Sequence, residues 1–203
     1  ESWREAWRGE TEQDAALPFY IVQLPPFGYS DPESASIVRE AQQDVADEVD
    51  HAGMVTTSDV GNLDDIHPTR KREVGERLAR LALARAYGIA GIAHSGPVYR
   101  RAVVEGNRVR IHFDHTDGGL RTGDGDLSGF EVSSQSQPSV FTSARASIEG
   151  RTIVVWKDDI SAPAAVRHGW GGQIENSSFF NGAGLPAAPF RTDSSRSTER
   201  SPR

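Results

Sequence analysis

Strand and helix patterns alternate over residues 19–88, and this alternation limits the fold more than any other feature of the sequence. The run 19–24 is almost entirely apolar and rich in β-branched and aromatic side chains, which is typical of a strand buried on both faces of a parallel sheet. We expect a helix at about 36–49, a second strand at 54–57, and a second helix after the loop 58–68. Strands separated by helices in this way predict a parallel sheet covered by helices.

The two expected helices carry apolar residues at helical spacing. Ser34 or Ser36 is the candidate cap of the first helix. Pro68 is expected at or near the first turn of the second, and Gly88 ends it. Charged residues of the second helix, Arg77 among them, are expected away from its apolar stripe. The apolar positions are Ile37, Ala41, Val45 and Val49 in the first helix, and Val74, Leu78, Leu81, Ala82 and Ala86 in the second.

The pattern changes after Gly91, where short runs with partial alternation replace the helical periods. Gly106-Asn107 and Gly150-Arg151 are typical of hairpin turns. This pattern predicts an antiparallel β-sandwich over about 93–193, followed by a polar, disordered tail at 194–203. The expected strands are 98–104, 108–113, 130–133, 143–148, 152–156 and 165–170.

Two strands are too few for a helix-covered parallel layer, so we expect residues 1–92 to be part of a larger α/β domain. The sequence begins with Glu1, and residues 2–7 resemble the end of a helix. A processed product or a fragment would both give this start, and we favour a fragment. The missing strands would then come from an upstream, N-terminal part of the same protein.

Composition narrows the possible partners. Hydrophobic residues make up 36% of the chain, enough for a packed core, and the net charge of −7 argues against a nucleic-acid partner. No apolar run approaches the ~20 residues of a membrane span. The absence of cysteine excludes disulfides, thiolate metal sites and a cysteine nucleophile, but it leaves the compartment open. We expect no cofactor and no metal site.

The loop 58–68 is the most informative segment for chemistry. It follows a buried strand and precedes a helix, at the carboxyl edge of the sheet, where open α/β folds bind ligands. His67 can act there as a general base, and Asp64 or Asp65 can accept its other ring N–H and fix the tautomer. Pro68 stiffens the backbone that aims the histidine. The alternative is an acidic loop with a surface histidine.

The Asp-x-x-His-Pro pattern between a strand and a long helix resembles the last conserved block of the SGNH hydrolases. Longer stretches, in the same order and covering nearly the whole chain up to Asp193, resemble the sialate O-acetylesterase family. The stretches are 17–24, 39–42, 65–68 with 71–75, 95–99 and 184–193.

This resemblance implies a flavodoxin-like SGNH domain followed by the β-sandwich, and a serine esterase that removes acetyl groups from sialic acid or other acetylated sugars. It implies His67 as the catalytic base. The superfamily spacing points to Asp64 as the acid, whereas the sialate esterase pattern points to Asp65, which we prefer. Family members are typically exported or lysosomal, so periplasmic, secreted or lysosomal location is the expectation.

The sequence departs from the family at the nucleophile. The glycine-rich turn with the catalytic serine, and the glycine and asparagine of the oxyanion hole, have no counterpart here. Ser58 and Ser95 lie near the motifs, but not in such a turn. We therefore expect the isolated chain to be inactive. The alternative hypothesis is a non-catalytic carbohydrate-binding or scaffold protein built on the sandwich.

Overall fold

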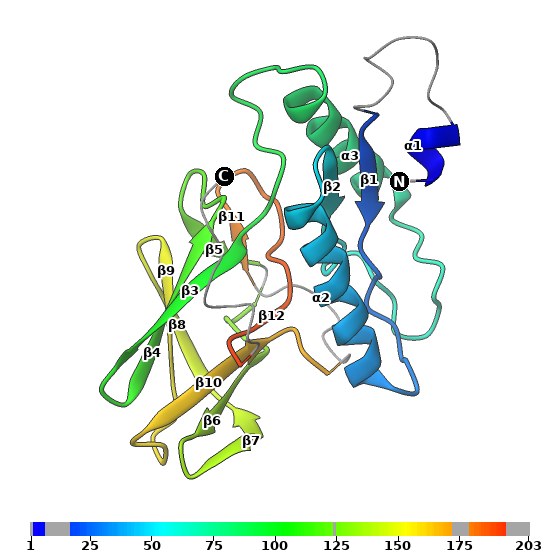
Figure 1. Ribbon diagram of the computed structural model, residues 1–203. Coiled ribbons are helices and arrows are strands. Elements are labelled where there is room, and N and C mark those ends of the chain that lie inside the picture. Colours follow the sequence, from blue (N-terminus) through cyan, green and yellow to red (C-terminus); the bar gives the residue numbers. More distant parts are fainter. Residues whose placement is uncertain (1, 7–16, 124, 172–178, 194–203) are drawn as a thin grey trace.

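The computed structural model describes residues 2–6, 17–123, 125–171 and 179–193 (Figure 1). After a short helix α1 (Ser2–Ala6), an α/β layer is formed by β1 (Phe19–Val22), α2 (Pro32–Glu48), β2 (Ala52–Val55) and α3 (Lys71–Arg85). A β-rich part lies beside this layer (Figure 1). Its strands are β3 (Val98–Glu105), β4 (Arg108–Asp114), β5 (Leu120–Thr122), β6 (Phe130–Ser134), β7 (Gln137–Ser143), β8 (Arg145–Glu149), β9 (Thr152–Trp156), β10 (Pro163–His168), β11 (Phe179–Asn181) and β12 (Phe190–Arg191).

The α/β layer is built around β2. β1 and β2 pair in parallel, as their pattern predicts, with Phe19 beside Ala52 and Val22 beside Val55. All four residues of β2 are buried, and both α2 and α3 pack against it. A Cβ atom at Gly53 would lie 3.2 Å from Leu81 Cδ2, so glycine lets α3 approach the strand closely.

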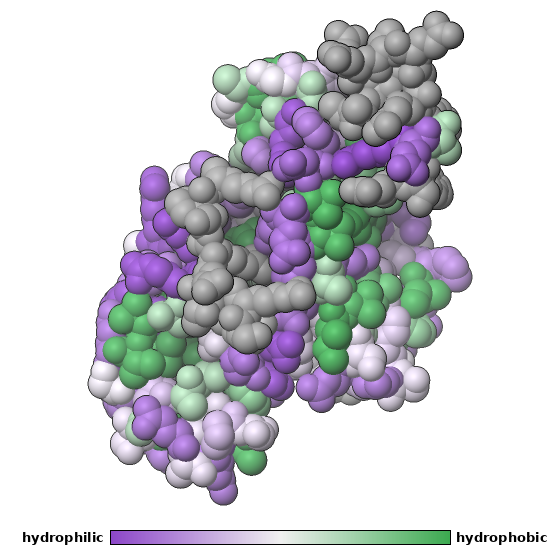
Figure 2. Space-filling model, viewed as in Figure 1, coloured by the Kyte–Doolittle hydropathy of each residue, from purple (hydrophilic) through white to green (hydrophobic). Residues whose placement is uncertain are grey.

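The expectation that the first strand is buried on both faces is wrong. Phe19 is 50% exposed and Val22 is 43% exposed, because β1 and β2 are the only strands of this sheet among the described residues. The apolar stripe of α2 also faces outward, and Figure 2 shows hydrophobic side chains gathered over this helix. Its members Ile37, Ala41, Val45 and Val49 are all exposed, and the neighbouring Val38 is exposed as well.

The buried face of α2 is largely polar, because it holds the chain that leaves β1. Arg39 donates from Nε to the Leu24 carbonyl (2.9 Å) and from Nη2 to the Pro25 carbonyl (3.0 Å). The Gln42 side chain accepts from the Leu24 amide at 2.8 Å. These bonds satisfy backbone groups that have no partner strand.

The helix ends differ from the expected caps. Asp31, not Ser34 or Ser36, caps α2 by accepting the Ser34 amide at 3.2 Å. Pro68 lies three residues before α3 instead of in its first turn, since the chain first forms the extended loop described below. Gly88 follows α3 with a φ of +66°, in agreement with the predicted glycine stop.

Two four-stranded antiparallel sheets form most of the β-rich part, in the orders β12-β10-β6-β7 and β3-β4-β9-β8, and β5 and β11 form a separate two-stranded antiparallel sheet. They share one hydrophobic core, in which the Tyr99 and Phe190 rings stack with centroids 5.1 Å apart. The hairpin turns expected at 106–107 and 150–151 join β3 to β4 and β8 to β9. Four strands were not expected from the sequence: β5, β7, β11 and β12.

The β-rich part is bonded to the α/β layer along α2 and the loop after β2. Arg191 forms a bidentate ion pair with Glu40 (3.0 and 2.7 Å), and Ser36 Oγ accepts the Gly171 amide at 3.0 Å. Ser58 Oγ donates to the Ala187 carbonyl at 2.9 Å. The expected disordered tail, 194–203, lies outside the described residues. None of the helices in the described ranges is long and apolar enough to cross a bilayer.

Candidate active site

The loop between β2 and α3 starts as a buried segment at the carboxyl ends of the two parallel strands. Gly61 passes the chain that follows β1 so closely that a Cβ atom there would lie 2.4 Å from the Pro26 carbonyl oxygen. The Asn62 amide donates to Pro26 (3.2 Å), and the Gly28 amide donates to the Leu63 carbonyl (2.9 Å). The two segments that leave the sheet are therefore fixed to each other.

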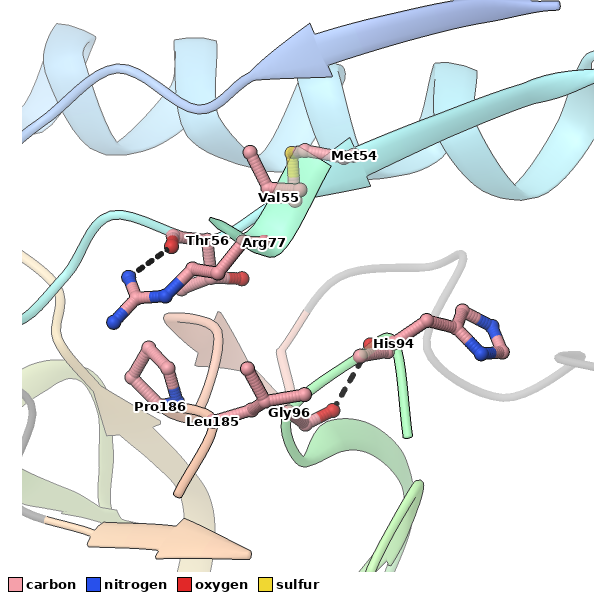
Figure 3. Close-up of a pocket in the computed structure, with 9 residues that line it drawn as sticks. Met54, Val55, Thr56, Arg77, His94, Gly96, Leu185 and Pro186 are labelled. Carbon is pink, nitrogen blue, oxygen red and sulfur yellow. Dashed lines mark hydrogen bonds between the residues drawn. The ribbon is translucent and has the colours of Figure 1, made fainter. Parts of the chain in front are cut away.

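A buried ion pair holds the beginning of this loop. Arg77 of α3 contacts both carboxylate oxygens of Asp59, at 2.7 and 2.6 Å, and donates to the Thr56 carbonyl at 2.7 Å. The two side chains are only 9% and 10% exposed. Figure 3 shows Arg77 reaching from α3 toward Thr56, with Leu185 and Pro186 of the β-rich part opposite. The geometry satisfies the charges that burial would otherwise leave unpaired.

This ion pair was not expected from the sequence. Arg77 was expected away from the apolar stripe of its helix, whereas the structure leaves it only 8% exposed. A signal was present: position 77 is three residues after Val74 and four before Leu81, so it lies on the same face of the helix. Asp59 is four residues beyond the end of β2, in the loop that α3 covers.

His67 and Asp65 contact each other in the second half of the loop. The His67 Nδ1 atom lies 3.2 Å from Asp65 Oδ1, and the His67 backbone amide donates to the same oxygen at 2.8 Å. The amide hydrogen bond, followed by the ring contact, lowers the pKa of the Asp65 carboxyl below its usual value. An ionised carboxylate at Nδ1 favours the tautomer that leaves the Nε2 lone pair open to take a proton.

The other candidate acid, Asp64, faces a different partner. Its backbone amide donates to Asn62 Oδ1 at 2.9 Å, and none of its hydrogen bonds within the described chain reaches His67. The geometry therefore favours Asp65 over Asp64 as the residue that orients the imidazole.

The imidazole itself is open to solvent. Its side chain is 84% exposed, and Asp65 is 57% exposed. In the part of the chain that the structure describes, no hydroxyl group is hydrogen-bonded to the ring. Ser58 donates to Ala187, and Ser95 Oγ donates to the Gly96 carbonyl at 3.0 Å. The described residues thus place a histidine beside a carboxylate, with no serine hydroxyl bonded to the ring.

The described part of the chain was also searched for side chains that could bind a metal ion. Across 2–6, 17–123, 125–171 and 179–193, no three histidine, aspartate or glutamate side chains are arranged to hold a metal ion.

Comparison with known proteins supports an esterase-like function at a coarse level. No protein-family model matches the sequence, and no curated protein matches it. Among solved structures, the chain is similar to a carbohydrate acetylesterase from Xanthomonas citri, with 35% sequence identity and a TM-score of 0.84. The similarity covers 95% of this chain and 44% of that protein, so the chain spans less than half of the length of that esterase. The match supports carbohydrate esterases in general, at a coarser level than the sialate O-acetylesterases.

Proposed function

We propose that this chain carries the acid–base pair of a serine carbohydrate O-acetylesterase, with His67 as general base and Asp65 as the acid that orients it. The observation that carries the proposal is the 3.2 Å contact between His67 Nδ1 and Asp65 Oδ1. It lies in a loop at the carboxyl ends of parallel strands, in a chain similar to an acetylesterase. We further propose O-acetylated sialic acids as the substrates, on the basis of the sequence resemblance.

The proposed reaction uses the free Nε2 atom of His67. A serine hydroxyl attacks the acetyl carbonyl carbon, and Nε2 takes the hydroxyl proton. The tetrahedral intermediate collapses, the sugar oxygen leaves, and the imidazolium returns the proton to it. Water then cleaves the acetyl-serine ester by the same proton transfers, giving acetate. Asp65 stays ionised throughout and stabilises the imidazolium.

The serine and the oxyanion hole are proposed to come from an upstream part of the same protein. Two features support this placement. The sheet has two strands among the described residues, and β1 leaves Val22 43% exposed at its side. The apolar stripe of α2 is also exposed, which is typical of a surface that packs against protein. Upstream structure that packs beside β1 and over α2 would cover both surfaces.

The test joins the chain to its upstream part and measures acetate release from acetylated sugars. His67→Asn is expected to lower the rate by about 10³-fold or more. His51→Asn is the matched control: His51 is exposed and has a φ of +57°, which asparagine tolerates. Equal activity of the parent and His67→Asn would end the proposal.

A second candidate function is a carbohydrate-binding or scaffold protein without catalysis. The 84% exposure of His67 favours it, because a general base normally works in a crevice. The same assay separates the two: saturable sugar binding with no acetate release, even when the upstream part is present, would establish the second function.

A further inference from the structure

The loop that carries His67 is anchored at its start but not along its second half. Residues 59–63 are held by the Asp59–Arg77 ion pair and by backbone hydrogen bonds to the chain that follows β1. In the segment 64–69, all residues but Pro68 are exposed, and every hydrogen bond that this segment forms in the described chain stays within the loop or reaches the first residue of α3. The position of His67 therefore depends on how the two ends of its segment are anchored.

Arg70 anchors the far end of this segment. Its Nη1 atom donates to the Asp59 carbonyl at 3.0 Å, across 11 positions of the sequence. The Nε atom of the same guanidinium donates to Glu73 Oε1 at 2.8 Å, in the first turn of α3. The Glu73 carboxylate thus orients the guanidinium while its other side reaches back to the loop, and a charged donor forms a stronger hydrogen bond than a neutral one.

Asp59 is consequently bound by two arginines that have different roles. Arg77 binds its carboxylate, and Arg70 binds its backbone carbonyl. The Arg77 side chain is 9% exposed, so its removal leaves a buried charge without a partner, whereas the Arg70 side chain is 52% exposed. Loss of Arg70 should therefore release the far end of the loop and leave the fold intact.

We propose that Arg70 is a positioning residue for His67, because its bond to the Asp59 carbonyl closes the segment 59–70 into a fixed loop. The inference rests on the proposed function, since it is the proposed base that Arg70 holds in place. Displacing a catalytic group by about 1 Å can lower a rate by about 100-fold. Arg70 acts through the loop and needs no contact with the substrate.

The first test uses the chain as it stands and measures backbone order by ¹⁵N NMR relaxation. In Arg70→Gln, the order parameters of the amides in 64–69 are expected to fall to about 0.6 or below. Arg72→Gln is the matched control, because it removes the same charge from the same turn of α3, where Arg72 is 88% exposed and contacts only Glu76. Unchanged order in Arg70→Gln, or an equal loss in Arg72→Gln, would overturn the proposal.

Urea denaturation separates a loosened loop from a weakened fold. The parent, Arg70→Gln and Arg72→Gln are expected to unfold at the same urea concentration, because neither arginine side chain is buried. A midpoint that falls in Arg70→Gln together with the order parameters would give Arg70 a general structural role and would refute its role in positioning.

The second test measures acetate release by the chain joined to its proposed upstream part. Arg70→Gln is expected to lower kcat by about tenfold with KM within about twofold of the parent, because the base is displaced while no substrate contact is removed. Parent-like kcat in Arg70→Gln would refute the positioning role and keep the esterase. No acetate release by the parent would instead refute the proposed function, and the loop order measured in the chain alone would stand.

Discussion

At the scale of single residues, one carboxylate oxygen organises the candidate site. Asp65 Oδ1 accepts a hydrogen bond from the backbone amide of His67, and it also contacts the ring Nδ1 atom of the same residue. This double contact orients the histidine by its own backbone as well as by its side chain, although the surrounding surface is open. Asp64, one position earlier, has no such contact within the described chain.

Substituting Asp65 should change the imidazole tautomer. In Asp65→Asn we expect fewer rings to carry the proton on Nδ1, because the amide no longer offers a charged acceptor. Ring nitrogen shifts measured by NMR above pH 8 check this directly. Asp64→Asn serves as the control and should leave the tautomer ratio unchanged; an equal shift in both variants would contradict the assignment of Asp65.

The same contact predicts a pH dependence. Because hydrogen bonding lowers the Asp65 pKa, the contact is complete above the usual aspartate value of about 3.9 and is lost only as pH falls through the lower folded value. The His67 amide resonance should therefore titrate with a midpoint below 3.9. A midpoint above that value would show that the hydrogen bond does not form in solution.

The ion pair of Asp59 and Arg77 should be costly to break from one side. Arg77→Met leaves a buried carboxylate without its cation, and we expect a loss of about 3–5 kcal/mol in the free energy of unfolding. Urea denaturation measures it. The double variant Asp59→Leu/Arg77→Met should recover much of the loss, since no charge then remains buried. Additive losses would instead show that the two residues do not act as a pair.

At the scale of elements, α2 and α3 use their apolar residues differently. Leu81 of α3 is 2% exposed against β2, whereas Val45 of α2 is 41% exposed. Strong helical periodicity was thus sufficient to predict both helices, but not which face of α2 is covered. The buried polar residues of α2 serve the backbone beyond β1, and that requirement is visible only in three dimensions.

This difference predicts opposite results for two substitutions. Leu81→Ala should reduce the free energy of unfolding by about 2–5 kcal/mol. Val45→Gln should change it by less than about 0.5 kcal/mol in this chain, but should weaken association with the proposed upstream part. Urea denaturation and co-purification of the two parts measure the effects. Strong destabilisation by Val45→Gln in the chain alone would mean that the stripe is already covered.

The predictability of the strands follows their length and surroundings. β4 and β9 contain alternating or continuous apolar residues, and the glycine turns beside them mark their ends, so both were predicted closely. β12 has two residues and β11 has three, too few for a period to appear. β7 is mostly exposed and contains Gln137 and Ser139, so its polar composition concealed it. Spacing anticipated a partner for His67 at Asp64 or Asp65, and the preference for Asp65 came from the family resemblance. The Asp59–Arg77 pair depends on how a loop and a helix pack, which the sequence pattern alone did not reveal.

At the scale of the whole molecule, stability depends on a buried histidine in the β-rich core. His168 lies among the rings of Phe130, Phe179 and Phe190, with centroid distances of 4.5, 5.0 and 5.8 Å. Burial lowers its pKa to about 3. Its neutral form is retained in the folded state, while the unfolded chain takes up a proton below the usual histidine value of about 6.5.

Acid should therefore destabilise the protein through this residue. The contribution of His168 is complete above pH ~6.5 and declines by up to about 1.4 kcal/mol per pH unit as the pH falls toward 3. Thermal unfolding at pH 7, 6 and 5 measures the slope, and His168→Phe should flatten it. A variant with the same slope as the parent would assign the acid sensitivity to other groups.

The bond between Ser58 and Ala187 also fixes an order of events during synthesis. These residues are separated by 129 positions, and the bond joins the start of the His67 loop to the return segment before β12. A ribosome must therefore make nearly all of the β-rich part before the loop can gain this contact. The segment that carries the proposed base is therefore synthesised well before the residue that anchors its loop.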